Sequence, residues 1–236
     1  MKKILTIISM VTLVSFSSNA LERSDISATI GVAANSAVYG ATGKETNRAE
    51  DNSIKTIKKE SGVFTETHTS FLIELNAGDF VSLGFEHTPD SITTPTDERL
   101  NRVNNKTTVS ADFNDLNIAY IKFNVPGGFY AKIGHVETDV DVKESMAAAA
   151  TAGTSSTYNN VSTNGTLVGV GYSKALGDTA MAIRVEGSYM ELDDVTSSNG
   201  VSPTGGSIAN GGRNQVDVSH LEGLNGKVAL TYTFGK

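Results

Sequence analysis

The histidines and the many serines of this 236-residue chain are the side chains most suited to acid–base or nucleophilic chemistry. The histidines are His68, His87, His135 and His220. A histidine activates a serine when the two lie within hydrogen-bonding distance and a third group orients the ring. None of the four stands in a recognisable catalytic motif. We therefore expect no enzyme activity, and the alternative left open is a serine and a histidine meeting on adjacent strands.

Carboxylates recur at alternate positions in two short segments. One holds Glu137, Asp139 and Asp141, and the other holds Glu191 and Asp193. Alternate residues of an extended strand project from one side, and carboxylate oxygens are ligands that Ca²⁺ prefers. Neither segment carries the glycine turn of a calcium loop, so we expect solvated charge. The sequence predicts no metal and no other cofactor.

Two charges interrupt the most regular stretch of the chain, residues 166–192. Its halves alternate with period two about a turn at residues 175–178, which predicts a β-hairpin. One face is apolar, and its members are Val168, Val170, Tyr172, Ile183, Val185 and Tyr189. Arg184 and Glu186 fall on the opposite face. They would meet water if the apolar face covered a protein core, or the inside of a closed barrel if that face met lipid.

The start of the chain favours the second interpretation. Lys2 and Lys3 precede an apolar run over residues 4–16 and a small-residue pattern ending at Ala20, which together predict a secretory signal peptide over residues 1–20. The mature domain would then be residues 21–236. No later apolar run is long enough for a transmembrane helix, so any membrane span must be made of strands.

Composition excludes several other classes of protein. Loss of Lys2 and Lys3 moves the net charge from −7 to −9, because two of the 19 basic residues leave while 26 acidic residues stay. Such a chain does not suit nucleic acid. There is no cysteine, so disulfides and thiolate metal sites are excluded. The mature length suits one sandwich or barrel domain.

Long and short connections alternate along the mature chain. Strands are expected at 24–39, 63–75, 80–88, 107–125, 129–136, within both halves of 166–192 and within 215–234. Short turns follow at 76–79, 126–128 and 175–178, and long loops at 40–62, 89–106, 139–165 and 193–214. Antiparallel up-and-down order puts all short turns at one end, as in outer-membrane barrels. Near Tyr120 the apolar residues change from one face of the expected strand to the other, which suggests a β-bulge or a slip in register there.

The segments GVGYSKALGDTAMAIRVEGSY, AYIKFNVPGGFYAKIGH and GKVALTYTF resemble the OmpA-type and opacity-type outer-membrane barrels. The resemblance implies an all-β, eight-stranded antiparallel up-and-down transmembrane β-barrel. It also implies a C-terminal assembly signal, here followed by Gly235 and Lys236, at Val228, Leu230, Tyr232 and Phe234. In such a barrel, aromatic residues form a girdle at the membrane interfaces. The candidates are Tyr39, Phe71, Phe85, Tyr120, Phe129, Tyr172, Tyr189, Tyr232 and Phe234.

The lumen of an eight-stranded barrel is just wide enough for side chains to fill it. Parity predicts that a group of charged side chains points inward, namely Glu74, Glu86, Lys132, Arg184, Glu186 and Lys227. Opposite charges there would compensate one another, with Arg184 and Glu186 expected to share a site. This predicts a structural plug, and a gated pore is the alternative.

The function expected from these patterns is structural and interfacial. The chain would be a monomeric barrel in the outer membrane of a Gram-negative-type bacterium, serving envelope integrity, adhesion or surface recognition. Its expected partners are outer-membrane lipid, lipopolysaccharide and, during insertion, the barrel-assembly machinery, with no partner assigned to the loops. A narrow pore or small-solute transporter is one alternative. A secreted soluble barrel that binds an apolar ligand is the other.

Overall fold

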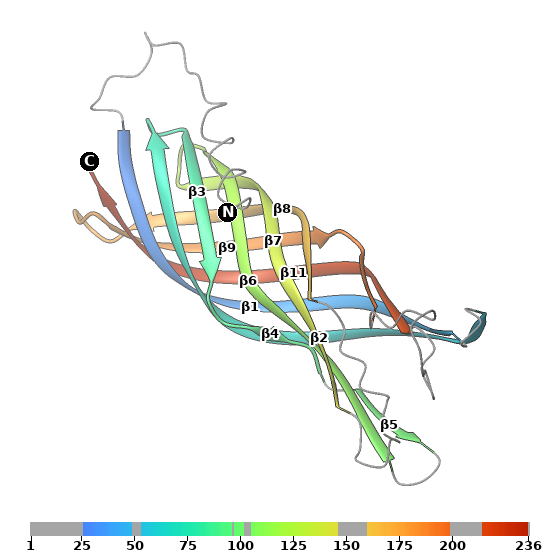
Figure 1. The fold of residues 1–236 in the computed structure, drawn as a ribbon. Helices are drawn as coiled ribbons and strands as arrows, with labels where there is room; N and C mark the ends of the chain where they lie inside the picture. The colour runs from blue at the N-terminus through green and yellow to red at the C-terminus, as the bar shows by residue number, and fades with distance from the viewer. Residues whose placement is uncertain are drawn as a thin grey trace.

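The computed structural model describes residues 26–48, 53–95, 97–101, 105–145, 160–198 and 214–235. All regular structure in these ranges is β-strand (Figure 1). The strands are β1 (Ile26–Arg48), β2 (Ile54–Ala77), β3 (Val81–Thr88), β4 (Ile92–Thr93), β5 (Asp97–Asn101), β6 (Asn105–Asn124), β7 (Phe129–Ser145), β8 (Val161–Ala175), β9 (Met181–Leu192), β10 (Val195–Ser198) and β11 (Asn214–Phe234). The expected signal peptide lies outside the described residues.

Eight of the strands close into a ring in the order β1, β2, β3, β6, β7, β8, β9, β11, and β11 pairs with β1. Every neighbouring pair is antiparallel. The short strands β4 and β5 pair with β6, and β10 pairs with β11. Closure leaves no unpaired sheet edge in the ring. The predicted all-β, eight-stranded antiparallel up-and-down barrel is confirmed.

The apolar side chains of the ring face outward. Val170 on β8 and Val185 on β9 are 68% and 54% exposed, whereas Arg184 and Glu186 are buried in the lumen. An outward apolar band with a polar interior is the pattern of a strand-built membrane span. The soluble alternative needed the opposite orientation, with the apolar face inside and the charges in water. The described residues contain no helix that is long and apolar enough to cross a membrane.

Tight turns join the strands at one end of the barrel, as the sequence predicted. Gly78, Gly127 and Gly177 take positive φ values of 62°, 94° and 61° in the three turns, a conformation that glycine adopts without steric cost. Gly128 also allows a close approach, because a Cβ there would lie 2.5 Å from the Ser173 carbonyl oxygen. Its own carbonyl accepts a hydrogen bond from the Ser173 amide at 2.8 Å.

At the other end the strands are much longer than expected. The prediction of a loop throughout residues 40–62 was wrong, because β1 and β2 remain paired as far as Arg48 and Ile54. Over residues 57–63 every side chain is exposed, so this part of the extension is polar because both of its faces meet water, not because it lacks strand structure. The β1–β2 hairpin and the β5–β6–β7 sheet project beyond the closed ring as two separate extensions (Figure 1). Their strands are longer than the about 9–11 residues that a transmembrane strand needs.

Two β-bulges adjust the side-chain parity of long strands. The β6–β7 register shifts between Asn114 and Asn117, and Asp115 has a φ of 51°. On β11, His220 has a φ of 54° where the pairing with β1 shifts. The predicted break near Tyr120 was therefore misplaced by five residues. Near Tyr120 the apolar residues of β6 change from the inner to the outer face because the lumen itself becomes apolar towards the outer end.

Candidate functional site

The six charged side chains predicted to face inward all lie in the lumen and are between 1% and 8% exposed. They come from five strands, because inward parity recurs on each wall of the barrel. Lys122 of β6 joins them. The seven are Glu74, Glu86, Lys122, Lys132, Arg184, Glu186 and Lys227, and together they are called the ion network. They form two clusters, each centred on glutamate carboxylates.

Glu74 of β2 is the centre of the first cluster. Arg184 reaches it from β9 and donates two hydrogen bonds, Nη1 to Oε1 at 2.7 Å and Nη2 to Oε2 at 2.8 Å. Lys122 donates to Oε2 at 2.6 Å, and the Tyr120 hydroxyl donates to Oε1 at 2.9 Å. Bidentate arginine–carboxylate pairs combine charge with fixed geometry. One carboxylate thus holds two cations.

Glu86 of β3 and Glu186 of β9 share two lysines in the second cluster. The Lys227 ammonium lies 2.8 Å from both Glu86 Oε2 and Glu186 Oε1. The Lys132 ammonium lies 2.6 Å from Glu186 Oε1 and 3.4 Å from Glu86 Oε2. The Ser70 hydroxyl also donates to Glu86 Oε1 at 2.7 Å. Two carboxylates and two ammonium groups compensate one another here.

Two tyrosines connect the clusters. Tyr120 donates to Glu74 in the first cluster, while the Lys132 ammonium of the second lies 4.6 Å from its ring centroid. Tyr130 donates to Glu186 in the second cluster at 2.9 Å, and the Lys122 ammonium lies 5.5 Å from its ring. Cations are attracted to aromatic faces at such distances. The ion network is therefore one connected layer across the lumen.

Each tyrosine ring lies over a glycine on the neighbouring strand. A Cβ at Gly84 would lie 2.2 Å from Tyr120 Cζ, and a Cβ at Gly171 would lie 2.3 Å from Tyr130 Cζ. The register places Tyr120 opposite Gly84 and Tyr130 opposite Gly171. These two glycines supply the space that lets a narrow lumen hold two phenol rings beside seven charged side chains.

The sequence missed the tyrosines and Lys122. Tyr120 and Tyr39 were expected in the outer aromatic girdle, but both have inward parity, and Tyr120 is buried. The bulge was predicted too close to Tyr120, so the inward orientation of Tyr120 was missed. In the structure, Leu116, Tyr120 and Lys122 all face inward, with no break in the alternation between them. The sequence did contain a usable signal. Tyr120 and Lys122 lie on one face of the strand, and the apolar residues Ile121 and Phe123 lie on the other face.

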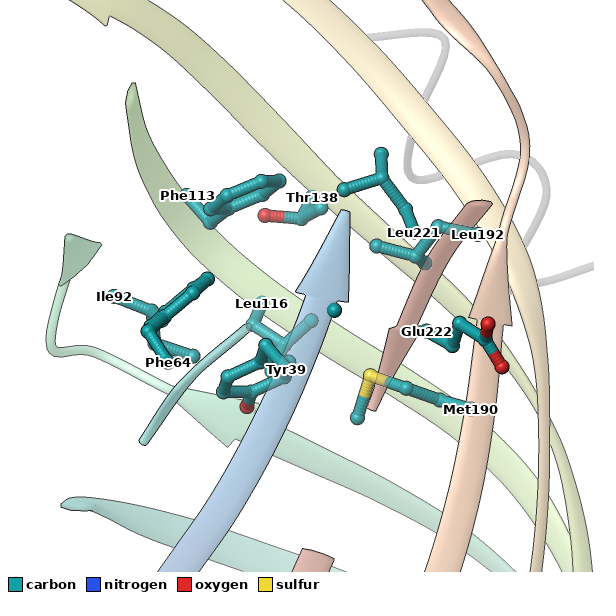
Figure 2. Close-up of a pocket in the computed structure, with 11 residues that line it drawn as sticks. Tyr39, Phe64, Ile92, Phe113, Leu116, Thr138, Met190, Leu192, Leu221 and Glu222 are labelled. Carbon is teal, nitrogen blue, oxygen red and sulfur yellow. The ribbon is translucent and has the colours of Figure 1, made fainter. Parts of the chain in front are cut away.

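An apolar layer fills the lumen on the outer side of the ion network. Its buried members are Ile92, Leu116, Ile118, Tyr120, Val136, Leu167 and Met190. Figure 2 shows a cavity at this level, with Phe64, Ile92 and Leu116 on one side and Met190, Leu192 and Leu221 on the other. The side chains come from β2, β4, β6, β9 and β11. From the tight-turn end outward, the lumen thus changes from charged to apolar.

The histidines singled out for catalysis lie apart from one another, although the His220 Nδ1 lies 3.2 Å from the Oγ of Ser219, the preceding residue. His68 faces the lumen, whereas His87 and His135 lie on β3 and β7, which β6 separates. His87 Nδ1 lies 2.8 Å from Asn117 Oδ1. His220 is exposed at the β11 bulge. Within the described ranges, no three His, Cys, Asp or Glu side chains are placed to hold a metal ion.

The alternating carboxylates take part in contacts between strands. Asp139 accepts a hydrogen bond from the Ser162 hydroxyl at 2.6 Å, and Asp141 accepts one from Asn114 at 3.1 Å. On the outer extension, Asp217 accepts from Gln215 and Thr196 and lies 3.6 Å from Lys44. Burial works to raise the pKa of Asp217, but these hydrogen bonds and the lysine charge outweigh it and hold the pKa below its ordinary value.

The last strand presents an apolar stripe to the outside. Its exposed members on β11 are Val228, Leu230, Tyr232 and Phe234. The rings of Tyr232 and Phe234 pack edge to face with centroids 4.7 Å apart. The stripe has the pattern that the resemblance associates with an assembly signal, and its recognition by the assembly machinery stays a prediction.

No family model matches this chain, and no curated protein matches it. Solved structures do resemble it. They include the outer membrane protein OprG from Pseudomonas aeruginosa, with 13% identity over 86% of this chain and 96% of that one and a TM-score of 0.49. The outer membrane protease OmpT from Escherichia coli has 11% identity over 92% and 100%, with a TM-score of 0.45. Ail, the attachment invasion locus protein of Yersinia pestis, has 10% identity over 86% and 98%, with a TM-score of 0.34. At these identities the likeness concerns the fold alone.

Proposed function

We propose that this chain is an integral barrel of a bacterial outer membrane with a structural and surface-interaction role, and that its lumen does not conduct. The ion network carries this proposal, because it fills the lumen with seven mutually bonded charged side chains drawn from β2, β3, β6, β7, β9 and β11. An eight-stranded lumen has little room beyond such side chains.

The outward face supports the membrane location. Large apolar side chains cover strands all around the ring, including Val32 on β1, Phe71 on β2, Phe123 on β6, Ile133 on β7 and Val228 on β11. Their contact with water would be costly over so large an area, and soluble monomers seldom expose such a surface. Lipid is the environment that removes this cost.

The outer extensions supply the interaction surface. The β1–β2 hairpin and the β5–β6–β7 sheet continue far beyond the length that a bilayer needs, so they present ordered backbone and mixed charge to the exterior. Lipid, lipopolysaccharide and the barrel-assembly machinery are the partners we propose for a monomeric, non-enzymatic barrel.

Single-channel recording tests the closed lumen against the pore alternative. The natural protein, refolded into planar bilayers, is expected to give no steady conductance. Replacing Lys132, Lys227, Glu86 and Glu186 together with alanine removes the second cluster and should open a small conductance, with a quadruple change of exposed loop charges as the control. A steady conductance of the natural protein would favour the pore or transporter.

A further inference from the structure

Two adjoining cavities occupy the outer half of the lumen. The inner one has a volume of about 30 Å³ and lies in the apolar layer. The outer one has a volume of about 240 Å³ and lies among the strand extensions. Phe113 and Leu221 line both cavities, so the two adjoin directly. The apolar residues that line the outer cavity include Val140, Val142, Val195 and Val218.

Two polar residues around the inner cavity, Thr138 and Glu222, already have partners. The Thr138 hydroxyl donates to the Asn114 carbonyl at 2.9 Å, and the Glu222 carboxylate accepts from the Tyr189 hydroxyl at 2.8 Å. Tyr39 also lines the cavity, and its buried hydroxyl oxygen has no hydrogen-bond partner. Against this largely apolar wall, a polar guest would lose its hydration and gain the Tyr39 hydroxyl as its one new partner, whereas an apolar guest loses nothing. The chemistry of the cavity therefore selects a hydrocarbon.

The two bulges shape this cavity. Asp115 and His220, both with positive φ, lie on β6 and β11, which face each other across the ring. Each is followed by a leucine, Leu116 or Leu221, whose side chain lines the inner cavity. Bulges concentrate next to functional sites because they redirect side chains, and positive φ at a non-glycine residue is a strained conformation. Two independent strained positions thus direct leucines to one point.

We propose that the cavities bind a small, uncharged, hydrocarbon-like molecule that enters from the outer mouth, with one alkyl end in the inner cavity. Charges of both signs at the mouth, including Lys44, Lys58 and Glu60, give no preference for an ionic ligand. The ion network lies beneath the inner cavity, so the site ends there along the barrel axis. This binding site goes beyond the structural role proposed above.

A tryptophan reporter tests the proposal, because the natural chain contains no tryptophan. Phe113→Trp places the reporter in the wall shared by both cavities, and Phe64→Trp is a second cavity position. Phe123→Trp is the matched control on the lipid-facing side of β6. Each variant is refolded into phosphatidylcholine vesicles, checked for heat-modifiable migration, and titrated with 1-bromohexane, a heavy-atom quencher.

The cavity reporters are expected to lose fluorescence along a saturating curve, and added hexane should restore it by competition. The Phe123→Trp control should lose fluorescence in linear proportion to bromohexane in the lipid, without recovery in hexane. The charged quencher bromide should produce no saturating loss at either cavity position. If both cavity reporters respond linearly like the control, or if hexane restores nothing, the cavities do not bind hydrocarbon.

Discussion

Arg184 binds Glu74 across the lumen, not Glu186, which lies two residues along the same strand. Both guanidinium Nη atoms contact the Glu74 carboxylate at 2.7 and 2.8 Å, while Glu186 is held by Lys132 and Lys227. The expectation that Arg184 and Glu186 compensate one another was wrong. Neighbouring inward side chains on one strand extend side by side, and each reaches its partner on another wall.

This arrangement makes Glu74 the most sensitive member of the ion network. It is the carboxylate that both Arg184 and Lys122 contact, so Glu74→Gln leaves two adjacent cations uncompensated in a dry interior. We expect a loss of about 3–5 kcal/mol in the free energy of unfolding, measured by urea titration in lipid vesicles. Arg184→Gln should cost less, because Lys122 still compensates Glu74.

A double change provides the control for that ranking. Glu74→Gln combined with Lys122→Gln leaves a single unpaired arginine, so it should be less harmful than Glu74→Gln alone, a non-additivity that a double-mutant cycle detects. Equal losses for Glu74→Gln and Arg184→Gln, together with strict additivity in the double variant, would contradict the assigned pairing.

The sequence determined which side chains enter the lumen but not which of them meet. Strict alternation places Arg184, Glu186 and Lys227 inside, because a strand with one face in lipid has no other place for charge. The partner of Arg184 depends on the stagger between strands that are far apart in the ring. The outer extensions were missed for a different reason, since a strand with water on both faces carries no apolar alternation to detect.

The glycines beneath the rings of Tyr120 and Tyr130 predict a second set of effects. Gly84→Ala should destabilise the barrel by about 1–3 kcal/mol through overpacking, because its Cβ would overlap the Tyr120 ring. Gly187→Ala is the matched control, since a Cβ there meets nothing within 4 Å. Thermal unfolding followed by gel migration measures both. Equal unfolding midpoints for the two variants would show that the Tyr120 side chain does not need the space at Gly84.

The bulge at Asp115 should tolerate glycine and reject valine. Its φ of 51° lies in the left-handed region, where a β-branched side chain is strained by roughly 1–2 kcal/mol. Asp115→Gly should therefore match or exceed the natural stability, and Asp115→Val should fall below it in the same urea titration. The backbone carbonyl of residue 115 still accepts the Asn117 side-chain hydrogen bond in both variants. A valine variant as stable as the glycine variant would argue against the bulge.

Acid should loosen the pairing of β10 with β11. The pKa of Asp217 is lowered in the folded protein, so its contribution to stability is complete above the ordinary value of 3.8 and is lost as the pH falls through the folded-state value. Amide hydrogen exchange at Val195 and Val218 should accelerate below pH 3.8 more than exchange within β8. In Asp217→Asn the difference between the two regions should no longer depend on pH in this range. Persistence of that dependence would assign it to another group.

The orientation of the wall is the central claim, and thiol labelling tests it most directly, because the natural chain has no cysteine. Val170→Cys places a single thiol on the lipid face of β8, and Ser198→Cys places one at the outer end of β10. In intact cells, a membrane-impermeant maleimide should label position 198 and leave position 170 unlabelled, while a bilayer-soluble maleimide should label position 170. Ready labelling of position 170 by the impermeant reagent in the folded protein would contradict the lipid-facing wall and the membrane barrel with it.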